Sequence, residues 1–450
     1  MNAKPYPKYK PSGVEWLGNV PEHWEVKRLK WVGEAIIGLT YSPDDVVNEG
    51  DGTLVLRSSN IQNGKIVLND NVFVSSEIPR RLRTKPKDIV ICTRNGSRAL
   101  VGKTGMISEQ ESDLTFGAFT AVFRSPANDY MFYVFNSGLF SFQAGLFQTS
   151  TIFQLTNGTI NSFLIPLPPS TEQQAIADFL DERTGKLDGL LGKKRELIGK
   201  LKEKRSALIS RTVTKGLPPE AAAKAGLTPN PKLKPSGIPW LGQIPEHWEA
   251  VTVRRKATRI QTGGTPPTSE ERFYEDGTVP WYGPSSFRDK ITVSKPVKFL
   301  NSSAVEECAA RVFRGGSTMI VTIGATLGKI ASLKESGSCN QQITVIEFDE
   351  SKIYPLFGTF QLKRLELALR AVAPSATLPI LDQGEIGDIP MAIPPVAEQV
   401  AIVDFLNTEL SKIDRMIQKV ETAIEKLTEY RTALITAAVT GKIDIRRFKS

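Results

Sequence analysis

The sequence contains one stretch twice. Residues 11–25 read Pro-Ser-Gly-Val-Glu-Trp-Leu-Gly-Asn-Val-Pro-Glu-His-Trp-Glu, and residues 235–249 read Pro-Ser-Gly-Ile-Pro-Trp-Leu-Gly-Gln-Ile-Pro-Glu-His-Trp-Glu. The two copies are 224 residues apart, and most of their positions are identical. Self-similarity at a fixed offset is the mark of a duplicated structural unit. The chain of 450 residues is therefore predicted to fold as two copies of one unit.

A second repeat introduces two long helices. A Pro-Pro-x-x-Glu segment ends at Glu172 and again at Glu398, and each is followed by apolar residues in steps of four and three. Such spacing is typical of a coiled-coil seam. Ser170 or Thr171 is predicted to cap the first helix. The predicted seam residues are Leu180, Leu187, Leu191, Ile198, Leu201 and Leu208 in the first helix, and Leu406, Ile413, Ile417, Val420, Ile424, Leu427 and Leu434 in the second.

The two helices are the obvious partners for each other. A helix over residues 171–213 would be about 65 Å long at 1.5 Å per residue, and an apolar stripe of that length needs a second surface. Pseudo-symmetry between two units of one chain predicts an antiparallel pair with a globular body at each end, a dumbbell. The predicted divisions are a first body (1–166), first helix (167–215), linker (216–234), second body (235–392), second helix (393–443) and tail (444–450).

The bodies are predicted to be of α/β class. Short apolar runs broken by polar turns predict strands at 53–60, 88–94 and 118–124 in the first body, and at 317–322 and 343–348 in the second. Residues 130–148 fit a buried helix or a strand, and residues 353–373 predict a helix. The middles of the two bodies diverge strongly in sequence, so the frame is duplicated while the bodies differ.

Composition excludes several classes of protein. The three cysteines are isolated, which predicts neither a disulfide framework nor a zinc site. The sequence has no run of about 18 apolar residues, and its start lacks a secretory pattern. A reducing, cytoplasmic setting without a membrane is therefore expected. Lys and Arg total 57 against 48 for Asp and Glu, a net charge of +9 that fits either a solvated surface or a polyanionic partner.

Catalytic motifs are not found. The only histidines, His23 and His247, both lie in the duplicated stretch, so they are predicted to pack or to hydrogen bond rather than to catalyse. Residues 324–329 resemble a phosphate-binding loop, but they have one residue too few between the glycines and lack the Ser or Thr after Lys329. The chain is predicted to be non-catalytic, with no metal ligands.

Several polar loops carry side chains of the types that can contact DNA. Arg and Asn pair with guanine and adenine edges, whereas basic runs contact phosphate; each also fits ordinary turn chemistry. The candidates in the first body are Arg57, Ser59, Asn60, Arg80, Arg81, Arg83, Arg94, Asn95, Ser97, Arg98 and Lys103. Those in the second are Thr262, Thr265, Tyr282, Ser285, Ser286, Arg288, Thr322, Lys329, Asn340 and Gln341.

Together these features resemble the specificity subunit of type I restriction–modification systems. The Trp-Leu-Gly-x-x-Pro-Glu-His-Trp lead-in, the two Pro-Pro-x-x-Glu-Gln helix starts and the two divergent bodies carry the resemblance, which covers nearly the whole chain. The resemblance implies two target-recognition domains that each read one half of a split, asymmetric DNA site. It also implies an antiparallel coiled coil that fixes their spacing.

The resemblance further implies partners. The family's subunit has no active site. It docks two modification subunits, which bind S-adenosylmethionine and methylate adenine, and the assembly adds restriction subunits that use ATP and Mg²⁺. No cofactor is expected on this chain. The alternatives are a methyltransferase or nuclease in its own right, a specificity subunit paired with a fused methylase–nuclease, and a DNA-binding scaffold outside restriction.

Overall fold

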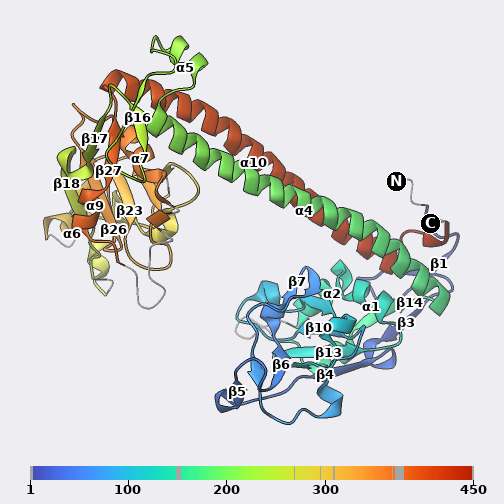
Figure 1. The fold of residues 1–450 in the computed structure, drawn as a ribbon. Coiled ribbons are helices and arrows are strands. Elements are labelled where there is room, and N and C mark those ends of the chain that lie inside the picture. Colours follow the sequence, from blue (N-terminus) through green and yellow to red (C-terminus); the bar gives the residue numbers. More distant parts are fainter. Residues whose placement is uncertain are drawn as a thin grey trace. The chain divides into compact units, whose positions relative to one another are not determined.

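The chain forms two compact units. The computed structural model describes residues 4–147, 154–267, 269–293, 295–307, 310–366, 368–369 and 380–447. One unit combines Met1–Arg195 with Glu421–Ser450, and the other is Glu196–Val420. Each unit therefore consists of one body and about half of each long helix (Figure 1).

The first body is built on two sheets. The six-stranded sheet has the order β4 (Glu34–Ile37), β13 (Thr120–Arg124), β10 (Ile89–Cys92), β11 (Thr104–Met106), β8 (Gly64–Ile66) and β7 (Ile61–Gln62). The four-stranded sheet has the order β12 (Thr115–Phe116), β6 (Thr53–Leu56), β9 (Phe73–Val74) and β5 (Val46–Val47). The strand pairs β1 (Tyr9–Pro11) with β2 (Asn19–Pro21) and β3 (Glu25–Arg28) with β14 (Leu164–Leu167) form the lead-in and exit, and the helices are α1 (Asn128–Phe135), α2 (Gly138–Leu146) and α3 (Asn157–Ser162).

The second body repeats this plan. Its five-stranded sheet has the order β18 (Ala257–Thr262), β26 (Ile343–Phe348), β23 (Thr318–Val321), β24 (Ile330–Leu333) and β20 (Thr292–Val293). Its four-stranded sheet has the order β21 (Lys298–Leu300), β19 (Val279–Tyr282), β25 (Gly337–Cys339) and β22 (Val312–Phe313). The pairs β15 (Leu233–Pro235) with β16 (Gln243–Pro245) and β17 (Glu249–Thr252) with β27 (Pro390–Ile393) match those of the first body, and the helices are α5 (Pro219–Lys224), α6 (Ser302–Glu306), α7 (Pro355–Lys363) and α9 (Gln383–Asp388).

Most of the predicted strands are confirmed, whereas two helical predictions change. Each of the five predicted segments contains a strand. The strand β26 fills its segment 343–348, whereas the other four strands are shorter than theirs because residues at the ends of those segments lie outside the ladder. The segment 130–148, which fitted a helix or a strand, forms the two helices α1 and α2. The helix predicted for 353–373 is confirmed in part: α7 covers Pro355–Lys363, a turn follows at 364–365, and Glu366, Ala368 and Leu369 are helical again, while residues 367 and 370–373 lie outside the described part.

The long helices are close to their predicted lengths. Helix α4 spans Ser170–Lys215 and α10 spans Val396–Val439. The predicted cap at Ser170 or Thr171 is not the one used, because Ser170 is already helical and the Pro169 carbonyl accepts bonds from the Glu172 and Gln173 N–H groups, both at 2.9 Å. Gln173 also holds the proline segment before the helix, since its side-chain amide donates to the Pro168 carbonyl at 2.8 Å.

Within each unit the two helices lie side by side and run antiparallel (Figure 1). In the first unit the start of α4 packs with the end of α10, and in the second the end of α4 packs with the start of α10. None of the predicted seam residues is exposed: Leu180, Leu191, Leu201, Leu406, Ile413 and Leu434 are buried, and Leu187, Ile198, Leu208, Ile417, Val420, Ile424 and Leu427 are half-buried. The seam prediction therefore agrees with the packing inside both units.

Two ion pairs bridge the helices at equivalent places. Arg431 Nε lies 2.9 Å from Asp188 Oδ1 in the first unit, and Arg205 Nε lies 3.4 Å from Asp414 Oδ1 in the second. Each residue is 226 positions from its counterpart in the other pair. Charged side chains at a helix seam favour one register over others, so the duplicated pair specifies the antiparallel alignment in both units.

Each duplicated histidine binds a duplicated glutamate. His23 Nε2 lies 2.7 Å from Glu172 Oε2, and His247 Nε2 lies 2.8 Å from Glu398 Oε2. Both glutamates are buried in the first turn of a long helix, with 6% and 7% of their surface exposed. The prediction of a hydrogen bond is confirmed, and we call each His–Glu pair a clasp because it joins a lead-in to a helix.

Other buried groups complete the two clasps differently. The Trp248 indole donates to Glu398 Oε1 at 3.2 Å. In the first unit the Tyr6 hydroxyl donates to Glu172 Oε1 instead, and burial raises the pKa of Tyr6, which keeps the hydroxyl a donor. Each glutamate thus has both carboxylate oxygens engaged, as a buried charge requires.

We predict that Glu398→Ala lowers the free energy of unfolding by about 2 kcal/mol, because it leaves the buried Trp248 N–H without its acceptor and His247 without its partner. Urea denaturation measures the change. Glu246→Ala is the matched control, since Glu246 directly precedes His247 in the lead-in and is exposed. This substitution should change the free energy of unfolding by less than about 0.5 kcal/mol. Equal midpoints for the two variants would contradict the structural role of the clasp.

Candidate nucleic-acid interface

Three loops of the first body meet at one end of its sheets. We call residues 57–60, 93–98 and 117–119 the N-terminal loop cluster. The Asn95 amide donates to Ser58 Oγ at 3.2 Å, which joins the loop after β10 to the loop after β6. The Phe119 carbonyl accepts from the Thr93 and Arg94 N–H groups at 2.9 and 3.1 Å, which adds the loop before β13. These bonds bring together candidates that the sequence places about 35 residues apart.

The cluster exposes some of the predicted residues and buries one. Ser59, Arg94, Ser97 and Arg98 are exposed, and Asn95 is half-buried. Asn60 is fully buried, with its amide donating to the carbonyls of Val67 and Asn69, both at 3.1 Å. The structure therefore gives Asn60 a bracing role within the loop, in place of the predicted base contact.

Arginine side chains in the cluster are held by neighbours. Arg57 Nη2 donates to the Asp70 carboxylate and to the Asp70 carbonyl, both at 2.8 Å. The Arg94 guanidinium lies 5.0 Å from the centre of the Phe119 ring, within the range of a cation–π contact. Phe119 is 59% exposed and precedes β13, although an aromatic residue in an apolar run predicts a strand residue and not a binding residue.

The basic run at 80–87 lies at the opposite end of the same strands. Strands β10 and β13 pair antiparallel with Ile89 opposite Phe123 and Cys92 opposite Thr120. Residue 88 and the run before it therefore stand at the end away from the loop cluster. Arg81 pairs with Glu34, and Arg83 pairs with Asp113 at 3.2 Å. Of the predicted basic run, Arg80 is exposed with no ion pair recorded among the described residues.

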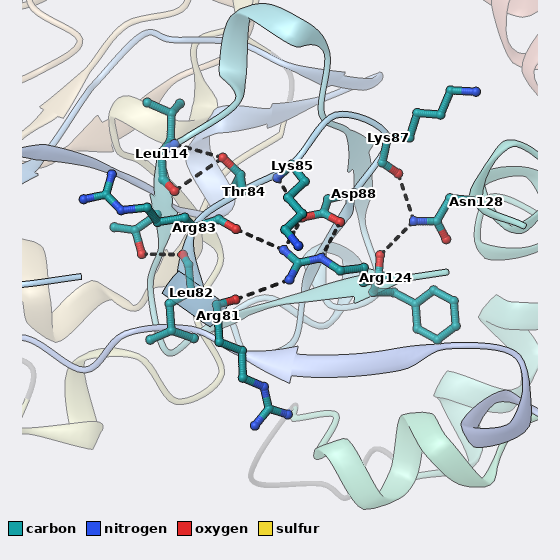
Figure 2. Close-up of polar contacts among 12 residues, drawn as sticks. Arg81, Leu82, Arg83, Thr84, Lys85, Lys87, Asp88, Leu114, Arg124 and Asn128 are labelled. Carbon is teal, nitrogen blue, oxygen red and sulfur yellow. Dashed lines mark hydrogen bonds and ion pairs between the residues drawn. The ribbon is translucent and has the colours of Figure 1, made fainter. Parts of the chain in front are cut away.

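The backbone of this run encloses a buried ion pair. Arg124 donates to Asp88 from Nε at 2.9 Å and from Nη2 at 2.6 Å, and its Nη2 also donates to the Arg83 carbonyl at 3.0 Å. Asp88 is 2% exposed, and its hydrogen bond raises the pKa of Arg124. Figure 2 shows the carbonyls of Arg81 and Arg83 facing Arg124 while their side chains point away. The run thus has a structural function that its charge alone did not indicate.

The second body has a matching group of loops. We call residues 262–265, 283–288, 322–329 and 340–342 the C-terminal loop cluster. Thr265, Ser285, Arg288 and Gln341 are exposed, whereas Thr262 and Ser286 are half-buried. The Asn340 N–H donates to the Tyr282 carbonyl at 3.0 Å, and the Thr265 hydroxyl donates to the Gln341 amide oxygen. The predicted polar residues of three separate segments are therefore neighbours.

Burial removes two candidates from this exposed set. Tyr282 has no exposed surface and packs in a core cluster with Phe287 and Phe313. Thr322 is 2% exposed, and its hydroxyl donates to the Gln342 carbonyl at 3.2 Å. Asn340, at 9% exposed, donates to Gln342 Oε1 at 3.0 Å. We therefore assign Tyr282 and Thr322 to the packing that supports the loops.

Two predicted lysines occupy equivalent positions. The Lys103 carbonyl accepts from the Cys92 N–H at 2.8 Å, and the Lys329 carbonyl accepts from the Val321 N–H at 2.9 Å. Lys103 thus immediately precedes β11, which pairs with β10, and Lys329 immediately precedes β24, which pairs with β23. Lys329 Nζ also donates to the Phe287 carbonyl at 3.3 Å. As phosphate contacts these two lysines remain predictions.

The groups that would support catalysis are few in the described part of the chain. Cys92 and Cys339 are buried free thiols, and burial raises the pKa of Cys339 to about 12; Cys308 lies outside the described residues. Among the described residues, no group of three or more His, Cys, Asp or Glu side chains is placed to hold a metal ion. No described helix is long and apolar enough to cross a membrane.

Comparison with known proteins gives a consistent match. A sequence model of the type I restriction modification DNA specificity domain matches residues 21–198 and 245–426. The specificity subunit of the type I restriction enzyme EcoKI from Escherichia coli (strain K12) is 29% identical over 203 residues, which is 44% of this chain and 44% of that protein. The specificity subunit of the type I restriction enzyme MjaVIII from Methanocaldococcus jannaschii is 23% identical over 95% of this chain and 94% of that protein.

The fold also has solved counterparts. A chain from a structure described as the basis of complex assembly and conformational transition of the type I R-M system has a TM-score of 0.59 and 17% identity. It covers 93% of this chain and 98% of its own length. This similarity shows that the two chains share a fold. The sequence alignment with the EcoKI subunit, by contrast, spans less than half of that protein.

We predict that Asp88→Asn lowers the free energy of unfolding by about 3 kcal/mol, because it leaves the partly buried Arg124 charge without its counterion. Asp70→Asn is the matched control. Asp70 is largely exposed where it pairs with Arg57, so its loss should cost at most about 1 kcal/mol. Chemical denaturation of both variants measures the difference. Similar losses of unfolding free energy would contradict a larger contribution of the Asp88–Arg124 pair to stability.

Proposed function

Since the chain belongs to the family of type I restriction–modification DNA specificity domains, we propose that it is the DNA-recognition subunit of such a system. Each body reads one half of a bipartite, asymmetric DNA site. The observation that carries this proposal is that both bodies present a polar loop cluster at the same end of the same strands, although their sequences differ there. Repetition of the frame with variation of the loops is what recognition of two different half-sites requires.

The long helices are proposed to set the distance between the half-sites and to dock the modification subunits. The bridging pairs Asp188–Arg431 and Arg205–Asp414 support a fixed register, which a spacer needs. The chain itself is proposed to be non-catalytic. S-Adenosylmethionine would bind to modification subunits, and ATP and Mg²⁺ to restriction subunits. The net charge of +9 would supply affinity for double-stranded DNA that is independent of sequence.

Two other arrangements make different predictions about partners. A specificity subunit of a fused methylase–nuclease would co-purify with a single larger protein, whereas a DNA-binding scaffold would co-purify with no methyltransferase. Tagged chain isolated from its own cells separates these cases by the mass of the bound partner. Methylation of DNA by the purified chain alone would sink the proposal that it is non-catalytic.

We predict that exchanging residues 31–165 for the corresponding body of a family member changes one half of the recognised site and leaves the other half intact. The reason is that each body carries its own loop cluster, while the helices are retained. Methylome sequencing of cells with the exchanged chain and its modification partner measures the result. A change in both halves would contradict the assignment of one half-site to each body.

We further predict that Arg94→Ala weakens DNA binding more than Arg80→Ala does. Arg94 is exposed in the N-terminal loop cluster, and Arg80 lies at the other end of β10 and β13. If Arg94 contacts phosphate, its removal lowers the salt dependence by about one counterion. Titration of the full chain against duplex DNA at several salt concentrations measures both quantities, and the reverse order would place DNA at the basic run.

A further inference from the structure

The two bodies share one short turn whose sequence differs completely. Residues 117–120 read Gly-Ala-Phe-Thr and precede β13, and residues 340–343 read Asn-Gln-Gln-Ile and lead into β26. The strands around the turns pair in the same register, with Cys92 opposite Thr120 and Val321 opposite Ile343. We call these two segments the reading turns.

Backbone hydrogen bonds establish the equivalence residue by residue. Four bonds hold the turn of the first body: Gly117 N to Leu56 O (3.0 Å), Thr120 N to Gly117 O (2.8 Å), Gly38 N to Thr120 O (3.1 Å) and Thr93 N to Phe119 O (2.9 Å). Their counterparts in the second body are, in the same order, Asn340 N to Tyr282 O (3.0 Å), Ile343 N to Asn340 O (3.1 Å), Gly263 N to Ile343 O (2.9 Å) and Thr322 N to Gln342 O (2.8 Å). Ala118 is therefore equivalent to Gln341, and Phe119 to Gln342. Because the backbone is held by bonds that no side chain makes, these two positions can vary without cost to the fold.

The side chains at the tips of the turns have opposite chemistry. Phe119 is 59% exposed, and the only charged group recorded over its ring among the described residues is the Arg94 guanidinium. The exposed part of the ring is apolar surface that remains open to a partner. In the second body Gln341 is exposed and Gln342 is half-buried, so the same place presents two amides.

The amides are oriented by neighbours. The Gln342 amide oxygen accepts from Asn340 Nδ2 at 3.0 Å, and the Gln341 amide oxygen accepts from the Thr265 hydroxyl. No acceptor within the described residues is recorded for either amide nitrogen. Each glutamine is thus held by its oxygen, and its N–H donors suit the N7 acceptor on the major-groove edge of a purine.

We propose that the two reading turns are equivalent base-reading elements that set different bases in the two half-sites. In the first body the Phe119 ring contacts the C5 methyl group of a thymine. In the second body Gln341 and Gln342 donate hydrogen bonds to a purine. This inference rests on the proposed function, since it assumes that the bodies bind DNA, and it identifies which residues at the loop clusters decide the sequence.

The test is selection from a randomised duplex library with the full chain, followed by sequencing of the bound DNA. The wild type must first select a two-part site; failure at that step would count against the proposed function, separately from this inference. Phe119→Gln should then reduce the preference for thymine at one position of one half-site by roughly 4-fold, as expected for the loss of one buried methyl contact, and leave the other half-site intact. Phe119→Leu should keep most of that preference, because it retains apolar contact.

The second turn supplies the reciprocal test. The double variant Gln341→Ala/Gln342→Ala should relax a purine position in the other half-site by a similar factor, and leave the thymine position unchanged. Trp31→Ala is the control, since Trp31 is 72% exposed and precedes β4 at the end of the sheet away from the reading turns. Selected sites identical to the wild type for both turn variants would overturn the inference, as would equal loosening of both half-sites by either one. Melting temperatures equal to the wild type show that each variant is folded.

Discussion

The rest of the structure depends on the contact between the histidine of each lead-in and a buried glutamate at the start of each long helix. Glu172 and Glu398 sit in the first helical turn, where a carboxylate is favoured by the free N–H groups of the helix. A buried carboxylate is costly unless its oxygens are bonded. The histidine of each lead-in supplies one partner, so the Pro-Glu-His-Trp stretch and the helix break must be retained together. This coupling explains why the lead-in and the helix start, although far apart in sequence, are both closely similar in the two copies.

The clasps also fix where each body meets its helix, which leaves the body interior free to diverge. The two bodies share the order of five strands in the larger sheet, to which the first body adds β7. They also share the bonds around the reading turns, with different side chains on nearly every loop. Backbone hydrogen bonds hold the turns, since a buried N–H or C=O must be paired whatever the side chain is. The frame can therefore stay constant while the exposed chemistry changes from a phenyl ring to a pair of amides.

Charge has two separate uses in the first body. The basic run at 80–87 looks like a nucleic-acid contact, but its backbone surrounds the buried Asp88–Arg124 pair and two of its arginines pair with Glu34 and Asp113. The arginine of the loop cluster lies over an aromatic ring at the other end of the strands. Density of charge in the sequence therefore did not distinguish arginines that pair within the body from an arginine that lies over an exposed ring.

The sequence by itself determined the duplication, the two helices and their seam, and most of the strands, because these depend on local periodicity and on repeats that can be read directly. It also identified the family, through motifs that belong to the duplicated frame. Only the tertiary structure decided which polar loops meet, that Asn60, Tyr282 and Thr322 are buried, and that Phe119 is exposed. These facts depend on strand pairing between segments distant in the chain. A four-residue strand separates one end of a sheet from the other, and no local pattern shows which end a loop will occupy.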